Sequence, residues 1–578
     1  MKLIYIKDNN SSLNLVDSSS INCEEVIFDS VRHSAQNFVD SLSKIEFNGI
    51  VISDKFGEDY VGLEICLRIR LSQNILGEKS FCSFFIFSNI SAESCFKNQL
   101  FAKQNTTASI FMTPGVFSFD NKEVLQILIN NDRNFNQLNN DNFTENFLNV
   151  IVLKKHPDFG NHSLANIWGA YKLAFITGNG DSIKHNEKQL KIKDDLYFMW
   201  LKAFYTSSTS EIKYPRKTIS SVSKRILFID DEEDKGWSEL LMKIFESSDF
   251  HVVKYSIRFF EDIKEEINKK QVDGLPLWDL ILLDLRLEKN EDYGENSNKP
   301  ASEYSGAKIL KDIKGINSGI QVIMFTASDK AWNMRELIDL GADGYYTKES
   351  PQSNLKNDFS LKNFAGFEKQ VNQCFENEFL KEAFHILKPL QTLLDEETKK
   401  NPKNCQLEFI QPGRIKEIHN QILLSKKLIK DYPSELKWGF LNIILTIEQI
   451  IKDSYTGDDK KQVVEINLFN KVTCMERINN DIFLCLTPLN NGDQYKLGKY
   501  RVPYDEEKFY NTLADRVPFN YRLTCVLYYK YSLPLDSSIF KFYHLYKLRS
   551  DSVAHSGSNS VLFKDLKLAI LLLNILIK

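Results

Sequence analysis

The sequence lacks the features that mark several common classes of protein. Its nine cysteines include no CxxC pair, which argues against a zinc site or a disulfide framework in so long a chain and predicts reduced, buried thiols. The formal net charge is −4, so no overall positive field attracts nucleic acid, and any RNA or DNA binding would have to be local. The amino end, MKLIYIKDNN, reaches a charge too early for a signal peptide.

Long hydrophobic runs are also missing. The apolar stretch 568–577 is about ten residues long and contains Asn574, whereas a helix that crosses a bilayer needs about twenty. We therefore expect a buried terminal helix, no membrane partner and a cytoplasmic location. No helix-turn-helix signature or basic recognition helix is evident, which disfavours a DNA-binding regulator.

What the sequence does contain is the composition of a folded, multidomain protein. Hydrophobic residues make up 43% and charged residues 26%, which excludes a largely disordered chain. The length of 578 residues predicts three or four domains. We expect a multidomain α/β plus all-α protein, with an α/β domain at 1–150, a helical segment and linker at 151–222, a doubly wound domain at 223–360 and a helical domain at 361–578.

The clearest pattern lies in the 223–360 region, where short apolar runs alternate with amphipathic segments. The runs predict strands at 226–229, 251–256, 278–287, 321–326 and 343–348, and helices at 237–245, 259–270, 305–313 and 331–340. Strands and helices that alternate in this way predict a doubly wound (βα)5 domain, a parallel sheet with helices on both faces.

Polar side chains stand at the carboxyl ends of these expected strands, where α/β domains place their functional residues. Asp230 and Asp231 follow the first strand, Asp284 the third, Thr326 the fourth and Lys348 the fifth. Three carboxylates in one crevice repel each other and need a cation, and oxygen ligands favour Mg²⁺. A lysine and a hydroxyl beside them suit a phosphoryl group.

This segment resembles the receiver domain of two-component response regulators, because its separated motifs follow one another in the order of that family. The resemblance implies that Asp284 is the phosphoacceptor and that a histidine kinase is the partner. It also implies that Asp230, Asp231, Asp284 and the backbone carbonyl of Arg286 hold Mg²⁺, while Thr326 and Lys348 bind the phosphoryl group. The alternative is a doubly wound domain with unrelated surface acids.

Two departures from the family pattern concern the neighbourhood of this site. The family usually places a glycine about eight residues after the phosphoacceptor, whereas here the equivalent Gly306 follows the polar insertion EKNEDYGENSNKPASEYS. That insertion is expected to shield or slow phosphotransfer, or to dock a partner. The proline common directly after the lysine comes only at Pro351, which puts the usual path into the last helix in doubt.

The 1–150 region carries a fainter version of the same pattern. Asp54 ends an apolar strand, Gly62 opens an amphipathic helix eight residues later, and a further strand ends at Ser88. Only Asp8 stands where an acidic pair would be expected, and the nearest candidate for a last strand, SIFMTPG, has no lysine. Two interpretations remain open: a degenerate, non-phosphorylated receiver-like domain, or an unrelated α/β domain.

The segment that follows is expected to be helical and then flexible. HPDFGNHSLANIWGAYKL contains two histidines without a further ligand set, so a helix that packs Trp168 inward is favoured over a metal site. The helix KIKDDLYFMWLKAFY follows, and the polar stretch 207–223 is predicted to be a linker.

From about residue 364 onward, three- and four-residue apolar spacing predicts a bundle of five or more helices. The pattern breaks over 462–500, where a β insertion or a loop is expected. Helices are expected again at 506–517, 522–531, 537–555 and 561–578.

The decapeptide LRSDSVAHSG near the carboxyl end places Arg549 and His555 six positions apart, about 120° from each other if helical. Histidine serves as a general acid or base near neutral pH, and arginine stabilises phosphate. This arrangement resembles the HEPN superfamily of helical ribonucleases, although Ser550 stands where that family often has asparagine. The resemblance implies catalysis by Arg549 and His555 supported by Asp551, RNA as substrate, no cofactor at this site and a composite site in a homodimer.

Together these patterns predict a response regulator in which phosphorylation of Asp284 controls a metal-independent ribonuclease. The biological setting implied by the resemblance is stress response or antiphage defence. The alternative is a non-enzymatic response regulator whose helical domain mediates dimerisation or binds another protein. An inactive HEPN-like bundle and an unrelated helical effector remain open as readings of the carboxyl-terminal region.

Overall fold

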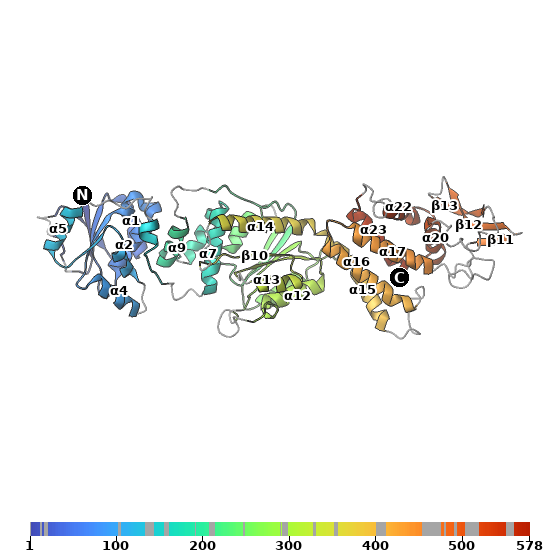
Figure 1. Cartoon of the computed structure of the whole chain (residues 1–578), viewed down its shortest axis with the longest axis horizontal. Helices are drawn as coiled ribbons and strands as arrows, with labels where there is room; N and C mark the ends of the chain where they lie inside the picture. The colour runs from blue at the N-terminus through green and yellow to red at the C-terminus, as the bar shows by residue number, and fades with distance from the viewer. Residues whose placement is uncertain are drawn as a thin grey trace.

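The computed structural model shows three regions in a row along the long axis of the molecule (Figure 1). The structure describes residues 2–11, 14–16, 21–101, 106–132, 144–154, 161–190, 192–206, 214–246, 249–288, 291, 299–327, 331–351, 357–399, 412–453, 475–478, 481–489, 494–502, 519–550 and 560–577. The first two regions are α/β and the third is mainly helical.

The first region is built on a five-stranded parallel sheet. Its strands are β1 (Leu3–Asp8), β2 (Cys23–Phe28), β3 (Gly49–Ser53), β4 (Ser83–Phe87) and β5 (Val116–Phe119), in the order β2-β1-β3-β4-β5. The helices are α1 (Ala35–Ser41), α2 (Val61–Leu71), α3 (Gln73–Leu76), α4 (Ala92–Phe101) and α5 (Lys122–Asp132). The central runs GIVIS and SFFIF are almost entirely buried, as expected for inner strands covered on both faces.

The second region repeats this strand order. Its strands are β6 (Arg225–Ile229), β7 (Asp249–Val253), β8 (Leu280–Leu283), β9 (Gln321–Thr326) and β10 (Gly344–Thr347), arranged as β7-β6-β8-β9-β10. The helices are α10 (Trp237–Ile244), α11 (Phe259–Ile267), α12 (Ser305–Ile316), α13 (Ala331–Asp339) and α14 (Asn357–Glu376). Buried residues of α10 and α14 cover one face of the sheet, and those of α11, α12 and α13 cover the other. The predicted doubly wound sheet is therefore confirmed.

Between the two sheets the described residues form the helices α7 (Asn161–Ile176), α8 (Lys184–Gln189) and α9 (Leu196–Thr206). Helix α7 packs against α10 and α14 of the second region, and α9 packs against α2 of the first. Buried side chains join α7 to α9, including Leu164, Trp168, Phe198 and Leu201. The inward packing of Trp168 that the sequence predicts is confirmed.

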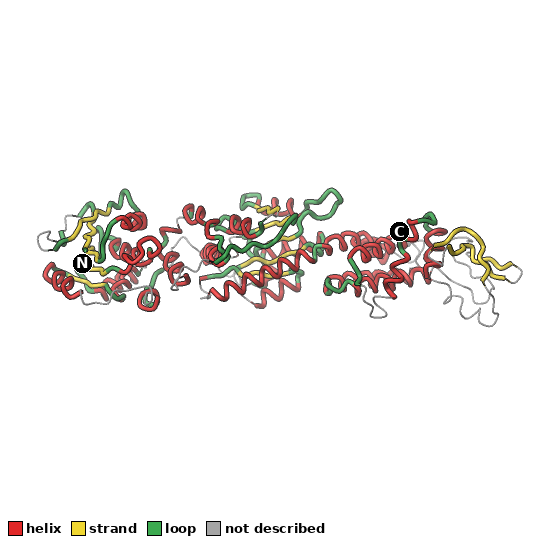
Figure 2. The backbone as a smooth tube through the Cα atoms, turned by 90° about the horizontal axis from the view of Figure 1, so that it is seen from above, coloured by secondary structure: helices red, strands yellow, loops and turns green. Residues whose placement is uncertain are grey.

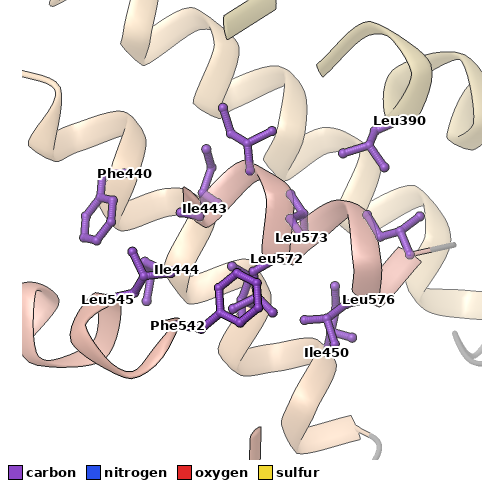
Figure 3. Packing of buried hydrophobic residues seen from close by; sticks show 14 of the residues in the cluster. Leu390, Phe440, Ile443, Ile444, Ile450, Phe542, Leu545, Leu572, Leu573 and Leu576 are labelled. Atoms are coloured by element: carbon purple, nitrogen blue, oxygen red, sulfur yellow. The ribbon is translucent and has the colours of Figure 1, made fainter. Parts of the chain in front are cut away.

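The third region is a bundle whose long helices are α15 (Phe379–Lys399), α16 (Pro412–Asp431), α17 (Lys437–Asp453) and α23 (Phe563–Ile577). The short helices α20 (Phe519–Cys525), α21 (Ser537–Phe540) and α22 (Tyr543–Leu548) complete it. Helix α23 packs on both α15 and α17, and its Leu572, Leu573 and Leu576 lie among the residues of the common core (Figure 3). The apolar end of the chain is thus buried by this core, and no helix within the described ranges is long and apolar enough to cross a membrane.

Some expected elements differ from the observed ones. The second strand of the central sheet is Asp249–Val253 rather than 251–256, and the fifth strand of the first sheet is Val116–Phe119 rather than SIFMTPG, which forms a short 3-10 helix over Thr107–Met112. The break in the bundle contains antiparallel strands β11 (Met475–Ile478), β12 (Asp481–Leu489) and β13 (Gln494–Val502), which are the yellow strands at the right-hand end of Figure 2. The helix expected at 506–517 lies outside the described residues.

The end of the expected linker is packed rather than free. Ile219 is buried, and its backbone N–H donates a hydrogen bond of 2.7 Å to the carbonyl of Ile244 at the end of α10. Helix α14 in turn runs past the boundary expected at residue 360, because Phe364, Phe367 and Val371 pack on the sheet of the second region.

Candidate functional site

The carboxyl ends of β6 and β8 bring two of the predicted acids together. The strands pair in parallel with Ile229 opposite Leu283, so the next residues, Asp230 and Asp284, stand side by side at the edge of the sheet. The backbone N–H of Asp284 donates to the carbonyl of Ile229 at 2.9 Å, which continues the ladder into the site. Both carboxylates are fully buried.

Lys348, directly after β10, supplies the cation between these acids. Its ammonium donates to Asp230 Oδ2 at 2.5 Å and to Asp284 Oδ1 at 3.2 Å. Burial opposes a charged ammonium, but the charges of Asp230 and Asp284 outweigh it and hold the pKa of Lys348 above its ordinary value. A fully buried ion pair of this kind is favourable only when each charge has such partners.

Asp231 has no such compensation. Its Oδ1 atom is buried without a hydrogen-bond partner, and burial, followed by the neighbouring charges of Asp230 and Asp284, raises the pKa of Asp231 to about 9. An orphaned carboxylate oxygen beside two further carboxylates is a donor set that suits Mg²⁺, which keeps several waters of its own. Within the described residues no group of three or more His, Cys, Asp or Glu side chains is arranged to hold a metal ion by itself. The carboxylates present therefore fit Mg²⁺ only with water supplying the rest of its ligands.

The remaining predicted site residues lie at the same edge. Thr326 ends β9 as a buried residue, and its carbonyl accepts a hydrogen bond of 2.8 Å from the backbone N–H of Lys348. The backbone N–H of Arg286 donates to Asp284 Oδ2 at 2.9 Å. Metal binding by the carbonyl of Arg286 stays a prediction, as do the roles of Asp230, Asp231, Thr326 and Lys348.

Gly306 holds the position that the sequence assigns to it despite the insertion. A Cβ atom on Gly306 would lie 2.0 Å from the carbonyl oxygen of Asp284, so only glycine lets α12 approach the strand end this closely. The insertion is fastened at the start of the same helix, because buried Glu291 accepts hydrogen bonds from the backbone N–H and hydroxyl of Ser305 at 2.9 and 2.6 Å.

The first region has a related but different arrangement. Its strand register puts Asp8 and Asp54 at the places that Asp230 and Asp284 hold in the second sheet. A Cβ on Gly62 would lie 1.8 Å from the carbonyl oxygen of Ser53, the same close approach as at Gly306. Asp54, however, accepts a hydrogen bond from Ser88 at 2.8 Å, where Asp284 accepts one from a lysine. Burial raises the pKa of Asp54, so this carboxyl is a poorer anion than a free aspartate.

One residue of the central site comes from a segment in which the sequence pattern predicted no function. Asn166 of α7 is fully buried, and its Oδ1 atom lies 2.7 Å from the ammonium of Lys348. The available signal was a single amide inside the mostly apolar stretch LANIWGAYKLAFI, which is a costly place for a polar side chain without partners.

The second candidate site is described only in part. Arg549 stands at the end of α22, about one quarter exposed, with its Nε atom 3.4 Å from Oε1 of Glu448 on α17. Burial raises the pKa of Glu448 above its ordinary value, although the charge of Arg549 acts in the opposite direction. Asp551 and His555 lie outside the described residues, so the proximity of Arg549 and His555 stays a prediction.

A comparison with known protein families supports the interpretation of the central region as a receiver domain. Residues 226–360 match the family model of the response regulator receiver domain. No curated protein matches the chain. Receiver domains generally bind Mg²⁺ at their phosphorylation site and receive their phosphoryl group from a histidine kinase, which is therefore the implied partner. Residues 226–360 therefore form a response regulator receiver domain.

Proposed function

We propose that Asp284 is the phosphoacceptor and that its phosphorylation controls the carboxyl-terminal bundle. The observation that carries this proposal is the buried ion pair in which Lys348 reaches both Asp230 and Asp284 at the carboxyl edge of the sheet. An ammonium beside the accepting oxygen is placed to neutralise charge that arrives there with a phosphoryl group.

The reaction is a phosphoryl transfer between a histidine kinase and Asp284. A carboxylate oxygen of Asp284 forms a bond to phosphorus, the P–N bond of the phosphohistidine breaks, and the imidazole nitrogen takes up a proton. Mg²⁺ bound at Asp230, Asp231 and Asp284 would supply charge neutralisation of the phosphoryl oxygens. Lys348 and Thr326 would then hold the product by donating hydrogen bonds to those oxygens.

Asp284→Asn protein is expected to take up no phosphoryl group from acetyl phosphate in the presence of Mg²⁺. The amide is not a nucleophile of comparable strength, so the loss should be complete within detection, as intact mass would show. Asp54→Asn serves as the matched control, because that aspartate ends the equivalent strand of the first sheet and should leave the mass gain unchanged. Phosphorylation of the Asp284→Asn protein at the wild-type rate would refute the assignment.

The route from the receiver to the bundle is short and tightly packed. Helix α14 of the receiver is followed after two residues by α15 of the bundle. Lys381 of α15 is buried and donates to Asp279 Oδ1 at 2.5 Å, at the amino end of β8. Burial alone would raise the pKa of Asp279, but hydrogen bonds from Lys381 and Arg225 outweigh it and lower the pKa. Because Lys381 joins α15 to Asp279, a shift of the receiver sheet would act directly on α15.

For the output of the bundle we propose metal-independent RNA cleavage by Arg549 and His555, with Asp551 in support. The 2′-oxygen of RNA would bond to the adjacent phosphorus while the bond from phosphorus to the 5′-oxygen breaks. His555 would take the proton of the 2′-hydroxyl or return one to the leaving oxygen, and Arg549 would stabilise the charged phosphate. The support is the partly exposed guanidinium of Arg549 at a helix end on the bundle, together with the resemblance to HEPN ribonucleases. By that resemblance a homodimer would complete the site, and stress response or antiphage defence would be its setting.

His555→Ala protein is expected to lose RNA cleavage by about 10²–10⁴-fold, the range usual for a general acid or base. Cleavage of a labelled RNA would be measured with and without beryllofluoride, which mimics the aspartyl phosphate. His544→Ala is the matched control, because His544 lies on α22 and its ring contacts Asp565 of α23. Arg549→Ala is less informative, since its loss also removes the ion pair to Glu448.

The alternative function is a non-enzymatic response regulator whose bundle dimerises or binds another protein. Absence of RNA cleavage by the wild-type protein in both phosphorylation states, with intact phosphorylation at Asp284, would favour this alternative. Cleavage that survives the His555→Ala change would remove His555 from the proposed site.

A further inference from the structure

The phosphorylation site contains a side chain that does not belong to the receiver segment. Asn166 is on α7, sixty residues before the matched region begins at residue 226. Its Oδ1 atom accepts from Lys348 Nζ at 2.7 Å and from Trp237 Nε1 at 3.2 Å, and its Nδ2 atom donates to Glu232 at 2.7 Å. Two donors on one side and a carboxylate on the other fix the orientation of the amide.

This contact completes the hydrogen bonding of Lys348. An ammonium has three donors, and Lys348 directs them to Asp230, Asn166 and Asp284 at 2.5, 2.7 and 3.2 Å. Phosphorylation and metal binding both act on the oxygens of the two aspartates. Of the three acceptors of Lys348, the amide oxygen of Asn166 is engaged by neither event. It can therefore hold the ammonium in place throughout.

Helix α7 packs closely against the receiver, which keeps Asn166 beside Lys348. A Cβ on Gly169 would lie 3.1 Å from the indole of Trp237 and 3.2 Å from the carbonyl oxygen of Glu349, so the helix lies directly against the segment that carries Lys348. Ala170, Leu173 and Ala174 continue the contact by packing into the receiver core. Asn166, Trp237 and Lys348 themselves are fully buried where α7 meets the receiver.

The opposite side of α7 leads away from the receiver to the first region. Trp168 of α7 packs edge-on against Phe198 of α9, with ring centroids 5.9 Å apart. Arg68 of α2 then hydrogen-bonds the backbone carbonyl of Asp194, just before α9. Packed contacts therefore run without interruption from the phosphorylation site through α7 to the first sheet.

We propose that Asn166 is a positioning residue for phosphorylation of Asp284, acting by holding the ammonium of Lys348 from outside the receiver segment. This inference rests on the proposed role of Asp284 as phosphoacceptor. Because coupling between two events is reciprocal, phosphoryl binding also tightens the docking of α7 on the receiver. The helix between the two sheets is thus the element through which the first region responds to phosphorylation.

The test compares beryllofluoride binding, in the presence of Mg²⁺, by full-length wild-type and variant proteins. Asn166→Ala should weaken binding roughly tenfold, the factor expected for one hydrogen bond to a charged group. Asn179→Ala is the matched control: this asparagine follows the end of α7, and its amide bonds Thr177 and Lys217 without reaching the site. It should bind as the wild type does.

A reversed pair separates positioning from simple loss of packing. Asn166→Asp combined with Glu232→Gln keeps the total charge and keeps an acceptor oxygen for Lys348. The hydrogen bond between the two positions is reversed, because the new amide at position 232 donates to the new carboxylate at position 166. This double variant should recover binding. Hydrogen exchange gives a second readout, because beryllofluoride should slow exchange across α7 in the wild type and in the double variant, but not in Asn166→Ala.

The outcomes are distinct. If a folded Asn166→Ala protein binds beryllofluoride as tightly as the wild type does, the inference is overturned, while the proposed role of Asp284 as phosphoacceptor is unaffected. If Asn166→Ala unfolds, the double variant decides, since its failure to recover binding while folded would overturn the inference as well. Absence of beryllofluoride binding by the wild type would instead refute the proposed function of Asp284, and the inference with it.

Discussion

Lys348→Met protein will be destabilised by about 3–5 kcal/mol at neutral pH, the cost of leaving a buried charge without its partner. The methionine preserves the length of the side chain and its packing near Trp237 and Phe325, whose ring centroids lie 5.5 and 5.7 Å from the lysine nitrogen. What disappears is the ammonium that compensates Asp230 and Asp284. The loss can be measured by urea denaturation of the Mg²⁺-free protein.

The destabilisation caused by Lys348→Met should depend on pH with a definite sign. Burial already raises the pKa of Asp230 to about 6, and loss of the Lys348 charge raises it further above the value in the unfolded chain, so the native variant binds more protons than its unfolded state. Stability then falls as pH rises, and the variant should be weaker at pH 8 than at pH 5.5. Lys254→Met, which removes an exposed partner of Glu233, should cost no more than about 1 kcal/mol. Equal losses in the two variants, or a loss independent of pH, would contradict the buried ion pair.

Mg²⁺ will bind the receiver more tightly as pH rises from 7 to 9. Burial and the adjacent acids raise the pKa of Asp231 to about 9, so below that pH the metal has to displace a proton from this carboxyl. Release of one proton makes the apparent affinity rise by up to about tenfold per pH unit, and the slope should flatten above the pKa. Calorimetric titration of Mg²⁺ at several pH values measures this slope.

Asp231→Asn removes the titrating group and should remove the slope as well, while lowering the affinity at pH 9. Asp234→Asn is the control, because that nearby carboxylate is exposed and outside the site. The same shift implies that the Mg²⁺-free protein loses stability as pH rises toward 9 and that Mg²⁺ restores it. A Mg²⁺ affinity that is constant between pH 7 and 9 would show that Mg²⁺ displaces no proton from Asp231.

Much of the receiver was predictable because local patterns there agree with the fold. Four-residue apolar runs followed by acids predicted β6 and β8, and Gly341, with φ of 106°, ends the helix α13 as expected from its sequence. The predicted bounds of β7, 251–256, were wrong at both ends, because the observed strand is Asp249–Val253 and the apolar signal HVV occupies only its end. Parallel pairing then brings the acids together, since strand ends meet at one edge of the sheet.

The first region shows how the same signal weakens. The strand order and the glycine at the start of α2 follow the receiver pattern, so the apolar runs and Gly62 were informative. The last strand was misplaced, because SIFMTPG is apolar enough for a strand yet forms a 3-10 turn, and the short β5 that follows has only four residues. A short apolar run alone does not distinguish these outcomes.

The sequence by itself determined the strands of the receiver, the acids at their ends and the helical character of the bundle, because these depend on periodicity over neighbouring residues. The tertiary structure alone decided that Asn166 reaches Lys348 and that Lys381 pairs with Asp279. Each of these contacts joins residues more than a hundred positions apart, and burial makes a polar group need a partner without specifying which distant segment supplies it.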